Sequence, residues 1–563
     1  MLRRSALFVL LAAACAGEPP PGTIGDGDDI ELCVGEVEVP DEALRELLLD
    51  VLPEPEPMDT TGGGDTGEPE PVILAEQLRK LPGLRGPMLG IKDLRGLECA
   101  QGLLSIGLSG NEIEDLTPLL DLPLLEELQL SDNKIDDLRT VGELRGLRKL
   151  VLDGNGIKDI GPLGRLTGLT YLDLGRNEIT DVGPLRPLEH MLALVLEENK
   201  ISDIAALEGM RDLFSLDISD NDVGSLAPLQ DHDQLGFVDL EGNRIATLTP
   251  LASATGMISI EVSRNELEDI EGVEAMHQLD RLSAQENRVR STAPVAGLSL
   301  MSVLDLGANE VDSLAGVETL VNLRKLALPD NAVGTIVAVS GLAELRELDV
   351  RNNPLTDLGP VATLPLLGTI FAGGTGEALD LSPLGGLTVL RRIVYQGGRA
   401  DTLAVLGTLP MVETIELDDT VLSPQAVADL GLAPTLQTIH IDRTGAADIS
   451  SLASLTLLEV LHAEDDAITD LTPLATLENL VTLNLAGNPL VSLEGLELQE
   501  FLSDLDVRRT TIVDLEPLLA NETFRTNDRV DARETGLGAD DCATIAAIEQ
   551  RMAVVLRDFD CVF

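Results

Sequence analysis

Aromatic and basic residues are scarce in this sequence. Tryptophan is absent, and only 2 Tyr and 8 Phe occur among 563 residues, so the chain does not build an ordinary aromatic-rich core. Lys and Arg number 39 against 97 Asp and Glu, which gives a formal net charge of −58. This balance excludes nucleic acid and anionic membrane surfaces as partners, because both require clustered positive charge. It favours solubility, with basic partners or cations as candidate ligands.

Catalytic motifs are also missing from the sequence. The chain has 5 His and no Ser/His/Asp or Cys/His arrangement, phosphate loop or H-E-x-x-H motif. Carboxylate pairs are common, but a solvated acidic surface explains them. We therefore expect a protein without catalytic activity and without a required cofactor.

One apolar run stands at the N-terminus, within residues 1–15. Arg3 and Arg4 precede an apolar stretch from Ala6 to Ala14 that is too short to span a bilayer as a mature helix. This is the pattern of an export signal. The stretch "LLAAAC" resembles a bacterial lipobox, which implies lipidation of Cys15 and an outer-membrane or cell-surface lipoprotein. The alternative is cleavage nearby and a freely secreted protein.

Two low-complexity segments flank the start of the folded chain. Residues 16–30 are rich in Pro, Gly and acids, as expected of a disordered tether. We assign residues 31–102 to an N-terminal cap with a helix at 40–52 that has Asp41 as its N-cap, and another helix at 72–81. Residues 53–71 interrupt them as a disordered insert. The apolar face of the first expected helix contains Leu44, Leu47, Leu48 and Val51.

An asparagine recurs every 22 residues after a strand-like Leu-x-Leu. Asparagine is a poor strand residue and is costly to bury unless its amide finds partners. Its carbonyl and NH₂ groups can satisfy backbone groups of its own turn and of the next one, so a stacked ladder explains the repeat. The register includes Asn111, Asn133, Asn155, Asn177, Asn199, Asn221, Asn243, Asn265, Asn287, Asn309, Asn331 and Asn353.

The rest of each repeat predicts a short return segment. Asp, Ser or Thr occurs four residues after the ladder position, and Pro often follows three places later, as in "DIGPL" and "DVGPL". These residues favour a capped helical turn, so we expect short 3₁₀ turns instead of long helices. Each coil then buries its apolar face only by stacking on its neighbours. The repeats cover 103–518 with about 19 strands, and a C-terminal cap covers 519–563.

The repeat consensus L-x-x-L-x-L-x-x-N-x-I-x-D-I-x-P-L resembles 22-residue leucine-rich repeats of bacterial internalins. The resemblance implies an α/β solenoid, a horseshoe with a parallel concave sheet. It also implies a non-catalytic scaffold for binding. The chain departs from the Gram-positive members in having few aromatics, no immunoglobulin-like domain after the repeats and no wall-sorting tail. Binding to a host-cell receptor is therefore not carried over.

Four cysteines besides Cys15 allow three disulfide pairings. Cys33 and Cys99 lie in the N-terminal cap, whereas Cys542 and Cys561 lie in the C-terminal cap at the other end of the solenoid. Since a disulfide needs Cα atoms within about 7 Å, we expect the bonds Cys33–Cys99 and Cys542–Cys561. Both would form in an oxidising compartment. We also expect a helix at about 540–551 and a final strand that carries Cys561.

The outward positions of the expected strands form the candidate binding face. Taken together, these positions are as acidic as the whole chain, but the two columns nearest the ladder are enriched in acids. One interpretation is a solvated surface, and the other is a stripe that binds a basic or cationic partner. The candidate residues are Tyr171, Asp173, Asp217, Phe237, Asp239, Glu241, Glu261, Asp305, Asp349 and Phe371.

His440 and His462 occupy equivalent positions of successive repeats, so adjacent strands should place them about 5 Å apart. Carboxylates surround the pair, at Glu416, Asp442 and Glu464. Such a set could hold Zn²⁺ or a similar divalent cation. The alternative is a pair of surface histidines in an acidic neighbourhood.

These observations predict an exported, monomeric recognition scaffold of the cell envelope. Its partner would be a protein or an envelope polymer bound on the concave face, and a lipid anchor would be its sole membrane contact. A cation-binding or structural envelope protein is the alternative. An intracellular regulator of phosphatases would share the repeat but conflicts with residues 1–15.

Overall fold

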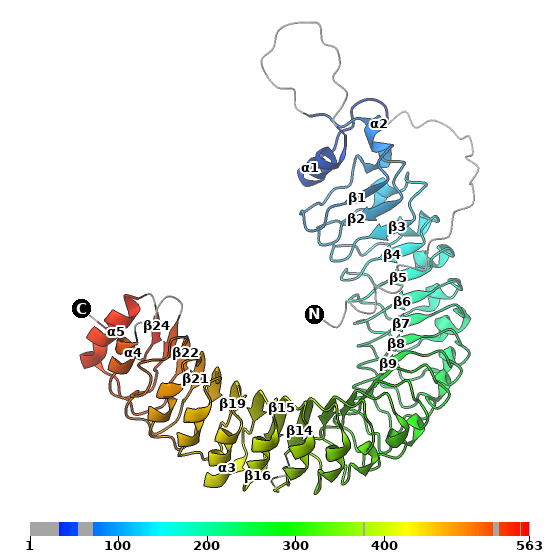
Figure 1. The fold of residues 1–563 in the computed structure, drawn as a ribbon. Coiled ribbons are helices and arrows are strands. Elements are labelled where there is room, and N and C mark those ends of the chain that lie inside the picture. The colour runs from blue at the N-terminus through cyan, green and yellow to red at the C-terminus, as the bar shows by residue number, and fades with distance from the viewer. Residues whose placement is uncertain are drawn as a thin grey trace, which may run out of the picture.

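The structure, a computed structural model, describes residues 33–53, 71–374, 376, 378–521, 528–551 and 553–561. The predicted export signal with Cys15, the tether and most of the 53–71 insert lie outside these residues. The described chain forms one open arc with the strands along its inner side (Figure 1). Neither this arc nor its caps include a helix with the length and apolar character needed to cross a membrane.

A single parallel sheet runs the length of the arc, with 22 strands among the described residues. Each strand pairs with the next one along the chain, apart from β16 and β18. The strands are β1 (Gly83–Arg85), β2 (Ser105–Gly107), β3 (Glu127–Gln129), β4 (Lys149–Val151), β5 (Tyr171–Asp173), β6 (Ala193–Val195), β7 (Ser215–Asp217), β8 (Phe237–Asp239), β9 (Ser259–Glu261), β10 (Arg281–Ser283), β11 (Val303–Asp305), β12 (Lys325–Ala327), β13 (Glu347–Asp349), β14 (Thr369–Gly373), β15 (Arg392–Gln396), β17 (Thr414–Glu416), β19 (Thr438–His440), β20 (Val460–His462), β21 (Thr482–Asn484), β22 (Asp504–Asp506), β23 (Arg529–Asp531) and β24 (Val554–Leu556).

The central residue of each strand anchors the sheet to the core. In β5, Leu172 is fully buried, while the outward Tyr171 and Asp173 are half-buried. Leu172 lies between Leu150 and Leu194 of the neighbouring strands, 22 residues away in each direction. The nineteen expected strands are β2 to β22 without β16 and β18. The sheet also extends into both predicted caps, by β1 at one end and by β23 and β24 at the other.

The outer side of the arc consists mainly of short 3₁₀ helices, as predicted. Asp181 illustrates the start of such a turn, because its Oδ1 accepts the Gly183 N–H at 2.8 Å just before Pro184. The 3₁₀ helices are Leu97–Cys99, Thr117–Leu119, Val141–Glu143, Gly161–Arg165, Gly183–Leu185, Ala205–Gly209, Ala227–Leu229, Thr249–Leu251, Ala293–Val295, Val317–Thr319, Val337–Val339, Gly359–Thr363, Ser382–Gly386, Ala404–Thr408, Leu430–Leu432, Ser450–Ser454, Thr472–Thr476 and Ala539–Asp541.

The asparagine ladder joins each coil to the one before it. The Nδ2 group of Asn177 donates to the carbonyls of Leu152 and Leu174 at 3.1 and 3.0 Å, and its Oδ1 accepts the Ile157 N–H at 3.1 Å. The same bonds recur along the register, for example at Asn243. The ladder therefore satisfies backbone groups that the turn would otherwise bury unpaired.

The N-terminal cap closes the first coil. Helix α1 (Glu42–Val51) begins after Asp41, whose side chain accepts the Leu44 N–H. Its buried residues are Leu44 and Leu48, whereas Val51 is 40% exposed and does not share the buried face that the periodicity predicted. Helix α2 (Ala75–Leu78) is shorter than expected.

A disulfide fastens this cap to the start of the repeats. It joins Cys33 to Cys99 with their Cα atoms 5.3 Å apart, and both cysteines are buried. This is the N-terminal pairing that the sequence predicted.

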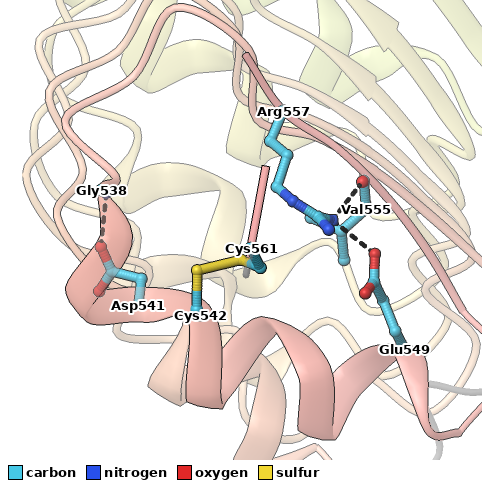
Figure 2. The surroundings of a disulfide bond; sticks show 7 residues. All are labelled: Gly538, Asp541, Cys542, Glu549, Val555, Arg557 and Cys561. Atoms are coloured by element: carbon cyan, nitrogen blue, oxygen red, sulfur yellow. Dashed lines mark hydrogen bonds and ion pairs between the residues drawn. A yellow bond between two sulfur atoms is a disulfide. The ribbon is translucent and has the colours of Figure 1, made fainter. Parts of the chain in front are cut away.

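The C-terminal cap contains α4 (Glu516–Ala520), α5 (Cys542–Glu549) and the final strand β24. Cys542 at the start of α5 bonds to Cys561, with 5.5 Å between their Cα atoms, which is the second predicted pairing (Figure 2). Cys561 lies five residues beyond β24, so the expectation that it belongs to the last strand is wrong. Arg557, just after β24, reaches back to Glu549 of α5 at 2.5 Å.

The repeats change shape between β14 and β19. Here β14 and β15 lengthen to five residues, β16 (Arg399–Ala400) pairs with β18 (Val421–Leu422) as a second small sheet, and α3 (Pro424–Asp429) precedes the 3₁₀ helix of its coil. Tyr395 is fully buried where the asparagines stop, and its hydroxyl donates to the Arg399 carbonyl. The looser spacing of the sequence after residue 353 thus corresponds to a local change in the structure of the coils.

Candidate binding face

The predicted face residues lie on the inner strands or directly after them. The strands β5, β7, β8, β9, β11, β13 and β14 carry all of them except Glu241, which follows β8 by two residues. Six of the acids share one local bond: each accepts the backbone N–H two residues later, as Asp217 does from Ser219 at 3.0 Å and Asp305 does from Gly307 at 3.2 Å. Part of the acidic enrichment therefore reflects turn chemistry after the strand.

Three of these acids stand side by side, and we call Asp217, Asp239 and Glu261 the acidic strip. They pair in register on β7, β8 and β9, at the spacing of adjacent strands, and all three are half-buried. Burial, reinforced by the charge of Asp217, raises the pKa of Asp239 to about 8. Burial also raises the pKa of Glu261. Like charges at this spacing destabilise a sheet, so ionising all three carboxyl groups at once costs free energy.

Asp173 extends the acidic character toward the N-terminal repeats. Burial raises the pKa of its carboxyl to about 7, and the neighbouring carboxylates of Asp153, Glu197 and Asp217 act in the same direction. Toward the ladder edge, Arg264 binds Asp220 at 2.8 Å and Glu241 at 3.1 Å. Glu241 is therefore an ion-paired member of the predicted set.

The aromatic residues of the face have cationic or aromatic neighbours. Lys149 lies 5.3 Å above the Tyr171 ring, and Phe237 packs edge-to-face on Phe214 with ring centroids 5.4 Å apart. Phe371 has Arg351 on one side and Arg392 on the other, at 4.8 and 5.4 Å from its centroid. Such arginines hold the ring by cation–π attraction.

Arg351 and Arg392 were missed by the sequence reasoning. Arg351 is fixed by Asp349, with Nη2 to Oδ2 at 2.6 Å, and Arg392 binds Glu416 at 2.6 Å. The predicted acids Asp349 and Glu416 thus neutralise arginines. Their positions could have been found, since both arginines occupy outward columns of the repeat. Their partners could not, because side-chain reach decides whether an arginine binds along its own strand, as Arg351 does, or across strands, as Arg392 does.

The two histidines adjoin as expected from their spacing. His440 of β19 pairs in register with His462 of β20, and their rings stack at 4.4 Å with an angle of 15° between planes. Asp442 accepts the Glu464 N–H at 2.7 Å. Throughout the described residues, no group of three or more His, Cys, Asp or Glu side chains is arranged to hold a metal ion. The stacked pair is thus not part of a formed metal site.

The repeat pattern and geometry agree with known protein families. Three family profiles match: "Leucine Rich repeats (2 copies)" at residues 145–187, "Leucine rich repeat" at 167–223 and "Leucine Rich repeat" at 122–138. The fold is a leucine-rich-repeat solenoid. No match was found among curated protein sequences.

Solved structures of leucine-rich-repeat proteins resemble this solenoid. An internalin, InlF, from Listeria monocytogenes is 28% identical with a TM-score of 0.54, covering 59% of this chain and 95% of its own. A leucine-rich-repeat protein from Leptospira interrogans is 20% identical with a TM-score of 0.50, covering 76% and 95%. The plant peptide hormone receptor RGFR1, solved in complex with RGF2, is 15% identical with a TM-score of 0.56, covering 82% and 88%. The last two share the fold alone.

Proposed function

We propose that this leucine-rich-repeat protein is an exported, non-catalytic recognition scaffold that binds a protein or an envelope polymer through its inner face. Solenoids of this kind present extended concave binding surfaces. Two disulfides support an oxidising compartment, and the export-like residues 1–15 support the cell envelope as the location. Lipidation of Cys15 would anchor the protein at the membrane surface.

The acidic strip is the observation that carries this proposal. Three carboxyl groups crowded on neighbouring strands are costly to ionise together, and such local conflicts are typical of functional surfaces. A cationic group from a partner would relieve the repulsion and favour ionisation of Asp239. We therefore propose a partner with Lys or Arg side chains, or amino groups of a polymer, at the contact with β7–β9.

Binding should weaken as salt rises, because ions screen charges over about 8 Å at physiological ionic strength. The test uses the mature protein against envelope extracts, followed by affinity measurements with the purified partner at low and high salt. The triple variant Asp217→Asn, Asp239→Asn, Glu261→Gln should lose most of the affinity. A matched variant, Glu189→Gln, Glu208→Gln, Asp233→Asn, replaces as many carboxyl groups at exposed positions of the same and the preceding repeats and should keep the affinity.

The opposite results would contradict the proposal. A partner whose affinity is independent of salt and unchanged in the strip variant would point to apolar contacts around Tyr171, Phe237 and Phe371. Absence of any envelope partner would favour the structural alternative.

A further inference from the structure

One position of the ladder differs from all the others in chemistry. From Asn111 to Thr510 the ladder positions hold Asn, Thr or Gly, except for Asp466, which alone is ionisable. It stands in the turn after β20 and is 9% exposed. Its Oδ1 accepts the N–H groups of Thr444, Gly445 and Ala446 at 2.8, 2.7 and 3.1 Å, together with the Thr444 hydroxyl. This oxygen thus performs the accepting half of an asparagine's task.

The other half of that task requires a donor. In the next coil, Nδ2 of Asn488 donates to the carbonyls of Ala463 and Leu485, which lie 25 and 3 residues before it. By the same spacing, the carbonyls that an asparagine at position 466 would bond are those of Ile441 and Ala463, and the atom that would donate to them is here Oδ2. That atom, Oδ2, is buried and has no hydrogen-bond partner in the described part of the chain. An ionised carboxylate would present a negative oxygen to two carbonyl oxygens, whereas a protonated one would present an O–H donor.

The charged residues around Asp466, at the joint between the coils of β19 and β20, are largely paired with one another. Arg509 of the following coil binds Glu464 at 2.6 Å and Asp465 at 3.1 Å. Arg443 of the preceding coil binds Asp419 at 2.6 Å. The titratable groups facing the joint from the packed strands and turns are Asp418, Asp419, His440, Asp442, Arg443, His462, Glu464, Asp465 and Arg509. Burial, the largest cause, favours the neutral form of Asp466 and raises its pKa, whereas the hydrogen bonds that Oδ1 accepts act in the opposite direction.

We propose that Asp466 is a proton-operated latch between the coils of β19 and β20. The neutral acid completes the ladder by donating from Oδ2 to the carbonyls in front of it. The carboxylate accepts more strongly at Oδ1 but leaves the contact at Oδ2 repulsive, so openings of the 444–446 turn that expose Asp466 to water become easier. The joint that carries the stacked His440 and His462 is thus tighter in mild acid than at neutral pH.

The sign of the effect follows from the direction of the pKa change. Burial raises the pKa of Asp466 to about 6, from an ordinary value of 3.8. A raised pKa means that the folded state binds the proton more strongly than the unfolded state. The stabilisation is therefore complete below the ordinary value and is lost as pH rises through about 6.

Hydrogen exchange at the amides of Thr444, Gly445 and Ala446 tests the latch. After correction for intrinsic exchange, their protection in the wild-type protein should fall by up to about thirtyfold between about pH 4.5 and 7.5, because part of the stabilisation is already lost at pH 4.5. Asp466→Asn restores the donor and should abolish the pH dependence relative to wild type. Glu459→Gln removes an exposed charge of the same coil and should leave it unchanged.

A reciprocal variant makes the test independent of residue 466. Asn221→Asp should create the same pH dependence at the Ile201 amide, which Asn221 accepts at 2.9 Å in the native ladder. Equal pH dependence in wild type and Asp466→Asn, or no new dependence in Asn221→Asp, would overturn the proposal.

Discussion

At the scale of single residues, this solenoid depends on side chains that copy backbone hydrogen bonding. Asn221 makes four bonds: Nδ2 donates to the carbonyls of Leu196, Ile218 and Ser219, and Oδ1 accepts the Ile201 N–H. Other polar side chains bridge coils elsewhere. The Nε2 of the buried His232 lies 3.0 Å from the Leu207 carbonyl, and Gln499 donates to Leu474 in the equivalent way, 25 residues back.

Replacing Asn221 by Leu should destabilise the protein by roughly 1–3 kcal/mol for each buried backbone group left unpaired. Leucine fills the space but can neither donate nor accept. Thermal or denaturant unfolding measures the loss. Asn322→Leu is the control, because Asn322 is exposed and makes a single bond to the Ser299 carbonyl. If both variants unfold like the wild type, the ladder does not stabilise the coil in this way.

The residue scale also shows where sequence reasoning succeeds and where it stops. The ladder and the capping acids were predictable because a fixed period exposes a shared geometric task, and both disulfides followed from the ends at which the cysteines lie. Two features were not predictable in the same way: the pairing of Asp349 with Arg351, and the Asp466 side chain, which accepts hydrogen bonds at Oδ1 but has no partner at Oδ2 among the described residues. They depend on which atoms of two rotamers meet, and period alone does not encode that.

At the scale of elements, adjacent strands convert sequence spacing into side-chain contact. Each of the nineteen predicted strands precedes one ladder position, so the ladder located them. The strands β1, β23 and β24 lack the asparagine signature, and their residues were assigned to the caps. Tyr395 and the pair β16–β18 show how a coil without the asparagine still closes, by a buried phenol and a small outer sheet. The strands β19 and β20 place His440 on His462 for the same reason of register.

Zinc titration decides what this histidine pair does. A nitrogen lone pair lies in the plane of its ring, so two stacked imidazoles do not direct their lone pairs at one ion about 2.0–2.1 Å from each nitrogen. We therefore expect calorimetry to give the same Zn²⁺ isotherm for metal-free wild type and for His440→Ala/His462→Ala. Zinc uptake that the double variant loses would restore the metal-site interpretation.

At the scale of the whole molecule, the two ends of the arc are its weakest places. An inner coil packs against neighbours on both sides, whereas β24 pairs, among the described strands, with β23 alone. Solenoids fray from such ends unless a cap holds them. Here the disulfide between α5 and the residues after β24 closes a loop with a sequence separation of 19 (Figure 2).

Replacing both Cys542 and Cys561 by Ser should lower stability by about 3 kcal/mol, and the loss should be confined to the terminal coils. Hydrogen exchange should show faster opening of β23 and β24, with the amides of β5 to β9 unchanged. Cys33→Ser/Cys99→Ser is the mirror control, which should open the first coil instead. Equal protection in β24 with and without the bond would mean that packing alone holds this end.

The constant strand register also bears on how such a chain changes length. From β2 to β14 every paired residue lies 22 positions from its partner. Deleting any 22 consecutive residues in this span therefore keeps equivalent positions of the repeat aligned. Buried leucine positions still follow one another at the repeat spacing, as do the ladder positions, and the arc is shorter by one coil. A cut whose length is not a multiple of 22 shifts the register at the junction, so leucine, outward and ladder positions no longer align and the core is broken there. The gene segment for these repeats is thus free to grow or shrink by unequal recombination in whole units, while both caps stay in frame.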